Sequence, residues 1–170
     1  MSVASPIWEM FLQKIDSATL LEHASLIYVR VVPKDLLPAL TFLAKDDAFQ
    51  MDYLKYMTVI DWEDHFELVY HLYSYRTNLE CCVSVEIARE NPIVASCHHI
   101  WPAANWHERE MYDVFGVTFS NHPNLQRLLL PVDWVGHPLR KDFVEQDHFN
   151  GVSTTRNNVV KLPSAREFES

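Results

Sequence analysis

The chain has 170 residues, which suits one domain, and its 48% apolar content is ordinary for a globular protein. The formal net charge of −9 resides in residues 1–120, which hold 8 lysines and arginines against 17 acidic residues. This balance argues against sequence-independent nucleic-acid binding, which needs cations to replace condensed counterions. No apolar run approaches the ~20 residues of a membrane span, and the N-terminus lacks the basic and apolar regions of a secretory signal.

Two helices are predicted in the first quarter of the chain. Ser5 can cap a helix that begins at Pro6, because serine is a favoured N-cap and proline fits the first turn. A second apolar stripe at helical spacing follows Pro33, in the segment "KDLLPALTFLAKD". Pro38 falls within about the first turn of that segment, where a proline costs a helix least.

Four segments are predicted to be strands because β-branched and aromatic residues dominate them: Leu26–Val32, Tyr53–Ile60, Phe66–Tyr75 and Leu79–Ala88. The last segment alternates most clearly between apolar and polar side chains. The short "RTN" before it indicates a hairpin connection. We therefore predict an α+β fold with a single, mostly antiparallel or mixed sheet of about four strands. One face of this sheet is expected to be half exposed, with helices packed on the other.

A short helix is predicted from about Ala103 to Phe115, where Gly116 stops it. Beyond it, prolines and glycines interrupt every possible long helix, yet "NLQRLLLPVDW" is too apolar for a solvated linker. We predict a compact body at residues 1–120 and an extended, partner-binding tail at residues 121–170. The tail is far longer than an ordinary loop, and its prolines limit the entropy lost on docking. The alternative is a tail that folds back on its own sheet.

The tail contains residue types that are common in interface cores. Tryptophan, leucine and phenylalanine are candidate anchors, and the charged residues between them are candidate polar contacts. The anchors are Trp134, Leu139 and Phe143, and the polar contacts are Arg140, Lys141 and Asp142.

The predicted helix at residues 103–115 carries the densest ionic cluster, at Glu108, Arg109, Glu110 and Asp113. Paired carboxylates can perform acid/base chemistry, but nothing in this spacing indicates the perturbed carboxyl that such catalysis needs at neutral pH. We favour the interpretation that these charges pair with an arginine of the tail or of another subunit.

The sequence offers few ligands for a metal or a cofactor. Three histidines lie near the charged helix, but neither C-x-x-C nor H-E-x-x-H occurs. The three cysteines are too few for the four thiolates of an ordinary iron–sulfur cluster, and their odd number indicates reduced thiols. No glycine precedes Gly116, which argues against a phosphate-binding glycine loop in the body.

The segment "NWHEREMYDVFGVTFSNHPNLQRLLLPVDWVGHPLRKDF" (Asn105–Phe143) resembles the signature of the 30 kDa subunit family of the proton-pumping NADH:quinone oxidoreductase, respiratory complex I. The matching words are "ERE" with Asp113 three residues on, "FG" at Phe115, "HPNL" from His122 and "GHPLRKDF" from Gly136. "RENP" and "IWPAANW" match upstream, so the resemblance covers nearly the whole chain.

The resemblance implies a structural, cofactor-free subunit of the peripheral arm. It implies docking on the large quinone-site subunit, of the 49 kDa type, near the other iron–sulfur subunits. The complex would pass electrons from NADH through FMN and iron–sulfur clusters to quinone, coupled to proton translocation. Its place would be the cytoplasmic side of the bacterial inner membrane, with no span or nucleic-acid contact of this chain. Members of the family often carry two basic residues after the HPxL stretch, whereas here Gln126 precedes Arg127.

Two alternatives stay open at this point. One is the equivalent subunit of a related membrane-bound hydrogenase or other dehydrogenase complex; the other is a free-standing, metal-dependent hydrolase. No catalytic, cofactor-binding or metal-binding residue is predicted. The residues predicted to bind the partner, or to hold the structure for it, are Glu108, Arg109, Glu110, Asp113, His122, Pro123, Arg127, Trp134, Gly136, His137, Pro138, Leu139, Arg140, Lys141, Asp142 and Phe143.

Overall fold

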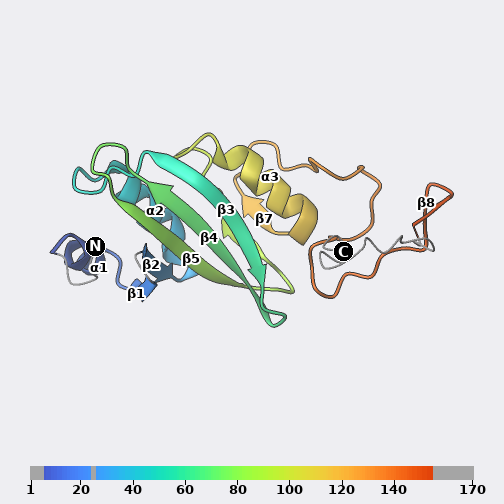
Figure 1. Ribbon diagram of the computed structural model, residues 1–170, viewed down its shortest axis with the longest axis horizontal. Coiled ribbons are helices and arrows are strands. Elements are labelled where there is room, and N and C mark those ends of the chain that lie inside the picture. The colour runs from blue at the N-terminus through green and yellow to red at the C-terminus, as the bar shows by residue number, and fades with distance from the viewer. Residues whose placement is uncertain (1–5, 24–25, 155–170) are drawn as a thin grey trace, which may run out of the picture.

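The computed structural model describes residues 6–23 and 26–154 (Figure 1). The helices are α1 (Pro6–Lys14), α2 (Leu36–Lys45) and α3 (Ala104–Phe115), and a 3-10 turn at Pro33–Asp35 precedes α2. The strands are β1 (Thr19–His23), β2 (Leu26–Val31), β3 (Tyr53–Asp61), β4 (His65–Tyr73), β5 (Glu80–Ala88), β6 (Ile93–Ala95), β7 (Thr118–Ser120), β8 (His148–Phe149) and β9 (Val152–Ser153). No helix in these two ranges is long and apolar enough to cross a bilayer.

The main sheet has five strands in the order β1-β2-β5-β4-β3. The pair β2–β5 is parallel and the other pairs are antiparallel, which confirms the predicted α+β fold and mixed sheet. The prediction of about four strands missed β1. Its sequence, "TLLEH", is too short to show a periodicity, and the strand forms by pairing with β2, where Leu21 lies opposite Tyr28.

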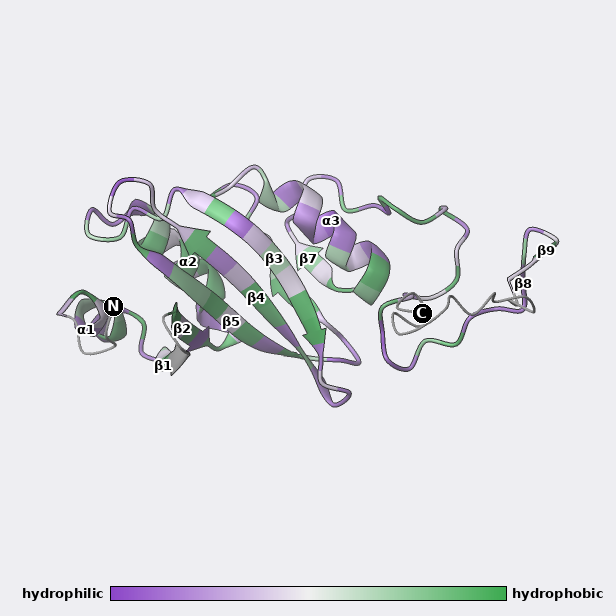
Figure 2. Ribbon diagram, viewed as in Figure 1, coloured by the Kyte–Doolittle hydropathy of each residue, from purple (hydrophilic) through white to green (hydrophobic). Residues whose placement is uncertain are grey.

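The helices pack against one face of this sheet, as predicted, and the core lies between them (Figure 1). Strand β4 supplies alternate residues to that core: Phe66, Leu68, Tyr70 and Leu72. Hydrophobic and hydrophilic residues alternate along the strands (Figure 2), because neighbouring side chains of a strand point to opposite faces. The second face of the sheet therefore carries its own set of side chains, with no helix of the described chain over it.

Helix α3 is held at the end of the body by a small parallel sheet, in which β6 precedes the helix and β7 follows it. Gly116 ends the helix in the left-handed conformation (φ +76°), as predicted, and its N–H donates to the Tyr112 carbonyl at 3.0 Å. A Cβ at this position would lie 2.5 Å from His137 Nε2. Glycine is thus required here both by the backbone and by the tail, which crosses directly over it.

Candidate partner-binding site

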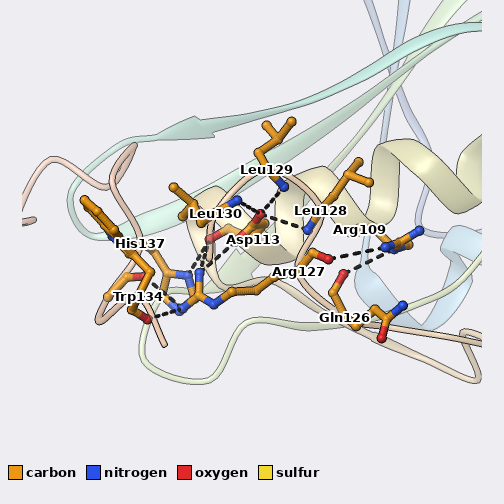
Figure 3. A network of polar contacts seen from close by, with 10 residues as sticks. Arg109, Asp113, Gln126, Arg127, Leu128, Leu129, Leu130, Trp134 and His137 are labelled. Atoms are coloured by element: carbon orange, nitrogen blue, oxygen red, sulfur yellow. Dashed lines mark hydrogen bonds and ion pairs between the residues drawn. The ribbon is translucent and has the colours of Figure 1, made fainter. Parts of the chain in front are cut away.

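The carboxylate of Asp113 is the centre of the first tail anchor (Figure 3). Asp113 is on α3 and has no exposed surface. Its Oδ2 accepts hydrogen bonds from three successive backbone N–H groups, those of Leu128, Leu129 and Leu130, at 2.7–3.0 Å. Its Oδ1 accepts from Arg127 Nη1 at 2.7 Å. Burial alone would raise the pKa of Asp113, but these donors outweigh it, so the pKa lies below its ordinary value.

Arg127 links this carboxylate to a later part of the tail. Its Nη2 donates to the carbonyl oxygens of Trp134 at 3.0 Å and Gly136 at 3.2 Å, which closes the loop of residues 127–136. The pairing of Arg127 with Asp113 confirms the interpretation that this helix uses a charge to bind a tail arginine. Arg109 contributes differently, because it donates to main-chain carbonyls at positions 126 and 127 and stacks over a tryptophan ring. Figure 3 shows Arg127 of the tail reaching Asp113, and Arg109 of α3 reaching the carbonyls of Gln126 and Arg127.

The C-terminal end of α3 is covered by the next part of the tail. The last carbonyls of a helix have no partner within the helix, and cationic or N–H donors stabilise them. Here each of the last three carbonyls accepts from a different tail residue. The pairs are His137 Nδ1 with the Asp113 carbonyl at 2.9 Å, Leu139 N with the Val114 carbonyl at 3.1 Å, and Arg140 Nε with the Phe115 carbonyl at 2.6 Å.

Among these three donors, His137 is the one whose side-chain type titrates near neutral pH. Burial lowers its pKa, and the neighbouring guanidinium groups of Arg140 and Arg127 lower it further. The neutral ring then carries its hydrogen on Nδ1, since a carbonyl oxygen can only accept. The ring therefore serves as a fixed, uncharged donor between two arginines.

A second anchor joins the tail to the turn between β3 and β4. The buried carboxylate of Asp61 accepts from Lys141 N at 2.9 Å and from Arg89 Nη2 at 3.0 Å. Arg89 also donates to Asp142 at 2.7 Å. Burial would raise the pKa of Asp61, but these hydrogen bonds and the charge of Arg89 lower it overall. Arg89 and Arg140 both lie over the ring of Phe66, at 5.6 and 5.1 Å from its centroid.

Part of the tail is apolar and exposed. Figure 2 shows this segment as a mixture of hydrophobic and hydrophilic residues. We name the exposed aliphatic set the apolar row: Leu129 (62% exposed), Val132 (93%), Val135 (65%), Leu139 (57%) and Val144 (84%). The tail thus binds the body through polar groups while these five aliphatic side chains stay exposed.

The side chains of Trp134 and Phe143, which were predicted to bind a partner, do not belong to the apolar row. Trp134 is half-buried against the Phe149 ring, at 4.9 Å between centroids, and Phe143 is close enough to Gly136 that a Cβ there would lie 2.9 Å from its ring. Both aromatic residues therefore pack within the tail. The alternative was a tail folded back on its own sheet; the polar groups of the tail contact α3 and, at Asp61, the end of one strand of that sheet.

Glu108 belongs to a separate cluster near the start of α3. It is fully buried, and it accepts hydrogen bonds from the Ser96 hydroxyl and from Cys97 N at 2.7 Å. The buried ring of His122 lies 3.8 Å from this carboxylate and contacts the Asn105 carbonyl. Glu110 is exposed, so the two glutamates do not form a carboxylate pair. Among the described residues, no group of three or more histidine, cysteine or acidic side chains can hold a metal ion.

A family model described as "Respiratory-chain NADH dehydrogenase, 30 Kd subunit" matches residues 29–149, which contain the second half of β2, strands β3 to β5, α3 and both anchors. The chain belongs to this family. It is therefore a subunit of the NADH-quinone oxidoreductase complex of the respiratory chain, and its partners are other subunits of that complex.

Sequence relatives agree with this membership. The chain is 42% identical over 119 residues to an NADH-quinone oxidoreductase subunit of Roseiflexus sp. strain RS-1, covering 68% of this chain and 67% of the relative. The corresponding subunit of Moorella thermoacetica is 46% identical over 116 residues, which is 66% of this chain and 77% of the relative.

Two solved structures share the fold. One is a trypsin-resistant fragment of Nqo5, with a TM-score of 0.58, 21% identity and coverage of 70% of this chain and 96% of the fragment. The other is a chain of the membrane-bound sulfane sulfur reductase, an archaeal respiratory membrane complex, with a TM-score of 0.66, 24% identity and coverage of 81% and 84%. At these identities the likeness concerns the fold alone.

In this member of the 30 kDa subunit family, the residues predicted from sequence fall into four groups. Most meet in the two anchors, Trp134 and Phe143 pack within the tail, Glu108 and His122 form the separate buried cluster, and Glu110 and Pro123 are exposed. Sequence reasoning missed Asp61, which falls between two predicted strands, and the ring of Phe66, which was considered only as a strand residue. A signal for Arg89 was present, since it opens the "RENP" word.

Proposed function

We propose that this chain is a structural subunit that docks on the large quinone-site subunit of the peripheral arm through the apolar row of its tail. The observation that carries the proposal is a tail that is bound to the body through polar groups and still exposes aliphatic side chains. Both anchors hold its backbone in one path while five aliphatic side chains stay exposed at 57–93%. A monomeric protein seldom keeps such a row in water, and a partner surface is the usual reason for one.

The geometry supports a stable interface. Full burial of a valine or leucine side chain contributes about 1.5–3 kcal/mol, so the apolar row can contribute on the order of 10 kcal/mol before the costs of association. Part of the ordering cost is already met in the free protein. The anchors fix residues 127–141, so docking does not have to order that stretch of chain.

We infer that the redox groups of the complex, FMN and the iron–sulfur clusters, are held by other subunits. All three cysteines of this chain are buried in the described structure. Burial raises the pKa of each thiol, to about 11 for Cys82 and further for Cys81 and Cys97. A thiol with a raised pKa is a poor metal ligand, because metals bind the thiolate. NADH and quinone would then react elsewhere in the complex.

We assign the protein to the peripheral arm, on the cytoplasmic side of a bacterial inner membrane. The support is membership in the family together with a fold in which none of the described helices is a membrane span. Attachment to the membrane would pass through the complex. Fractionation of cells should therefore place the chain with the membranes only when the complex is assembled.

The test is the double variant Val132→Asp/Val135→Asp, expressed in cells that lack the native protein. Both side chains are exposed, so the isolated variant should keep the melting temperature of the parent. Its content in purified complex should fall about tenfold or more, because two charges would be buried without partners. The matched control is Ile93→Asp, an exposed position on β6. Normal assembly of the double variant would refute docking through the apolar row.

A further inference from the structure

The face of the main sheet away from the helices carries exposed aromatic residues along its edge strand. We name the aromatic stripe by its members: Tyr53 (44% exposed), Tyr56 (44%), Ile60 (37%), Trp62 (52%) and Tyr75 (69%). The strand register places them on this face, since Tyr56 lies opposite His71 and Ile60 opposite Glu67, whereas core residues fill the alternate positions. Strand β3 makes the stripe about 30 Å long at 3.3 Å per residue.

A β-bulge in β3 concentrates the stripe. The register shifts between Leu54 and Tyr56, so Lys55 has no partner of its own on β4. Tyr53 and Tyr56, three residues apart, would otherwise point to opposite faces of the sheet. With the bulge, both tyrosines and Lys55 lie on the open face, while Leu54 stays in the core. The bulge thus adds a side chain to a surface that the core does not use.

The rings of the stripe gather at one end. Tyr75 follows β4, and its ring centroid lies 5.5 Å from that of Tyr53 and 5.0 Å from that of Tyr73. Trp62 stands at the other end, where its Nε1 donates to Glu67 at 3.0 Å. The four aromatic residues of the stripe nevertheless stay 44–69% exposed. Tyrosine and tryptophan are the residues most enriched in the energetic centres of protein interfaces.

The charges on this face are paired within the chain and leave an excess of carboxylate. Arg30 is shared by Glu67 at 3.6 Å and Glu86 at 3.1 Å, and Lys55 is bound to Glu80. Both cations are therefore occupied, and three glutamates face two cations. The side chain of Glu86 is still 46% exposed. The two residues after Trp62 are also acidic and largely exposed: Glu63 (74%) is bound to Lys141 at 3.2 Å, and Asp64 (80%) lies 2.9 Å from His65 Nδ1.

We propose that the aromatic stripe is a second docking surface, independent of the tail, and that its occupant is a protein segment carrying arginine or lysine side chains. Aromatic rings and an excess of carboxylates over cations attract the same kind of group, and a guanidinium satisfies both. A second copy of this chain fits less well, because it would bring two acidic faces together. An anionic membrane surface is repelled for the same reason.

Hydroxyl-radical footprinting tests the surface in the protein as it exists. The full chain alone and the purified NADH-quinone oxidoreductase complex are labelled under identical conditions. Tyr53, Tyr56, Trp62 and Tyr75 should react about fivefold more slowly in the complex, as expected for side chains in the dry centre of an interface. The buried Trp8 supplies the unlabelled reference in both samples. Equal labelling of the stripe in the two samples overturns the proposal.

A charge-reversal pair tests the occupant. Glu86→Lys on the open face should weaken retention of the chain in the complex about fivefold, equivalent to ~1 kcal/mol. Glu9→Lys makes the same change of charge on α1, at an exposed position, and should have no effect. Equal behaviour of the two variants overturns a cationic partner. So does stripe-dependent dimerisation of the isolated chain, or its binding to phosphatidylglycerol vesicles with loss of stripe labelling.

Discussion

Replacing Asp113 by asparagine should release the tail from α3 while leaving the body folded. The carboxylate is fully buried and accepts four hydrogen bonds, one from a guanidinium and three from backbone N–H groups. Removing one partner of a buried ion pair typically costs about 3–5 kcal/mol. The tail can escape this cost by opening to water, so the loss should appear as a shift of the opening equilibrium.

A shift of that size multiplies the open population by about two to four orders of magnitude. Native-state hydrogen exchange measures it directly, at the amides of Leu128, Leu129 and Leu130. Exchange of the β4 amides should stay at the parent rate, because their bonds lie within the main sheet. The control is Glu110→Gln, the same change of group at an exposed position on the same helix. Tail exchange within tenfold of the parent would show that Asp113 does not hold the tail.

Three further outcomes are expected. Gly116→Ala should lower the free energy of unfolding by about 1–3 kcal/mol, because of its positive φ and the crowded position of the added Cβ. Gly151→Ala has open space around the added Cβ and should lower it by about 1 kcal/mol. Thermal melts of the two variants make the comparison. The pKa values of Asp113 and Asp61 are lowered in the folded protein. Both anchors should therefore be intact above the ordinary aspartate pKa of about 4, and they should open as the pH falls through the lowered folded pKa values. Tryptophan fluorescence of the tail can follow this opening. Arg127→Lys should keep the charge but lose the contacts to two carbonyls, and it should raise tail exchange about tenfold.

The sequence predicts the elements of this fold well where periodicity is strong. Strands β2 to β5 and helices α1 to α3 were all predicted, because their apolar residues recur at clear intervals. β1 and β6 to β9 were missed. Each has five or fewer residues, and each exists because a neighbour offers it a hydrogen-bonding edge. Such pairing is a tertiary effect that a local pattern does not contain.

The candidate site was predicted in part. Composition indicated a tail with two kinds of residue, and helical spacing indicated that Asp113 needed a cation. Neither pattern could indicate that one carboxylate would accept hydrogen bonds from three successive backbone N–H groups, because almost every residue supplies the same backbone donor. Composition also suggested Trp134 and Phe143 as anchors for a partner, but they pack inside the tail. The division at residue 120 into body and tail stays a prediction.

The carbonyls at the end of α3 have a consequence for synthesis of the chain. Three of them receive their donors from residues 137–140, more than twenty positions further on. The last turn of the helix is therefore incomplete until that later stretch has left the ribosome. A shortened chain that stops before residue 137 should have a frayed end of α3. The helix is therefore completed only after most of the proposed partner-binding tail has been synthesised.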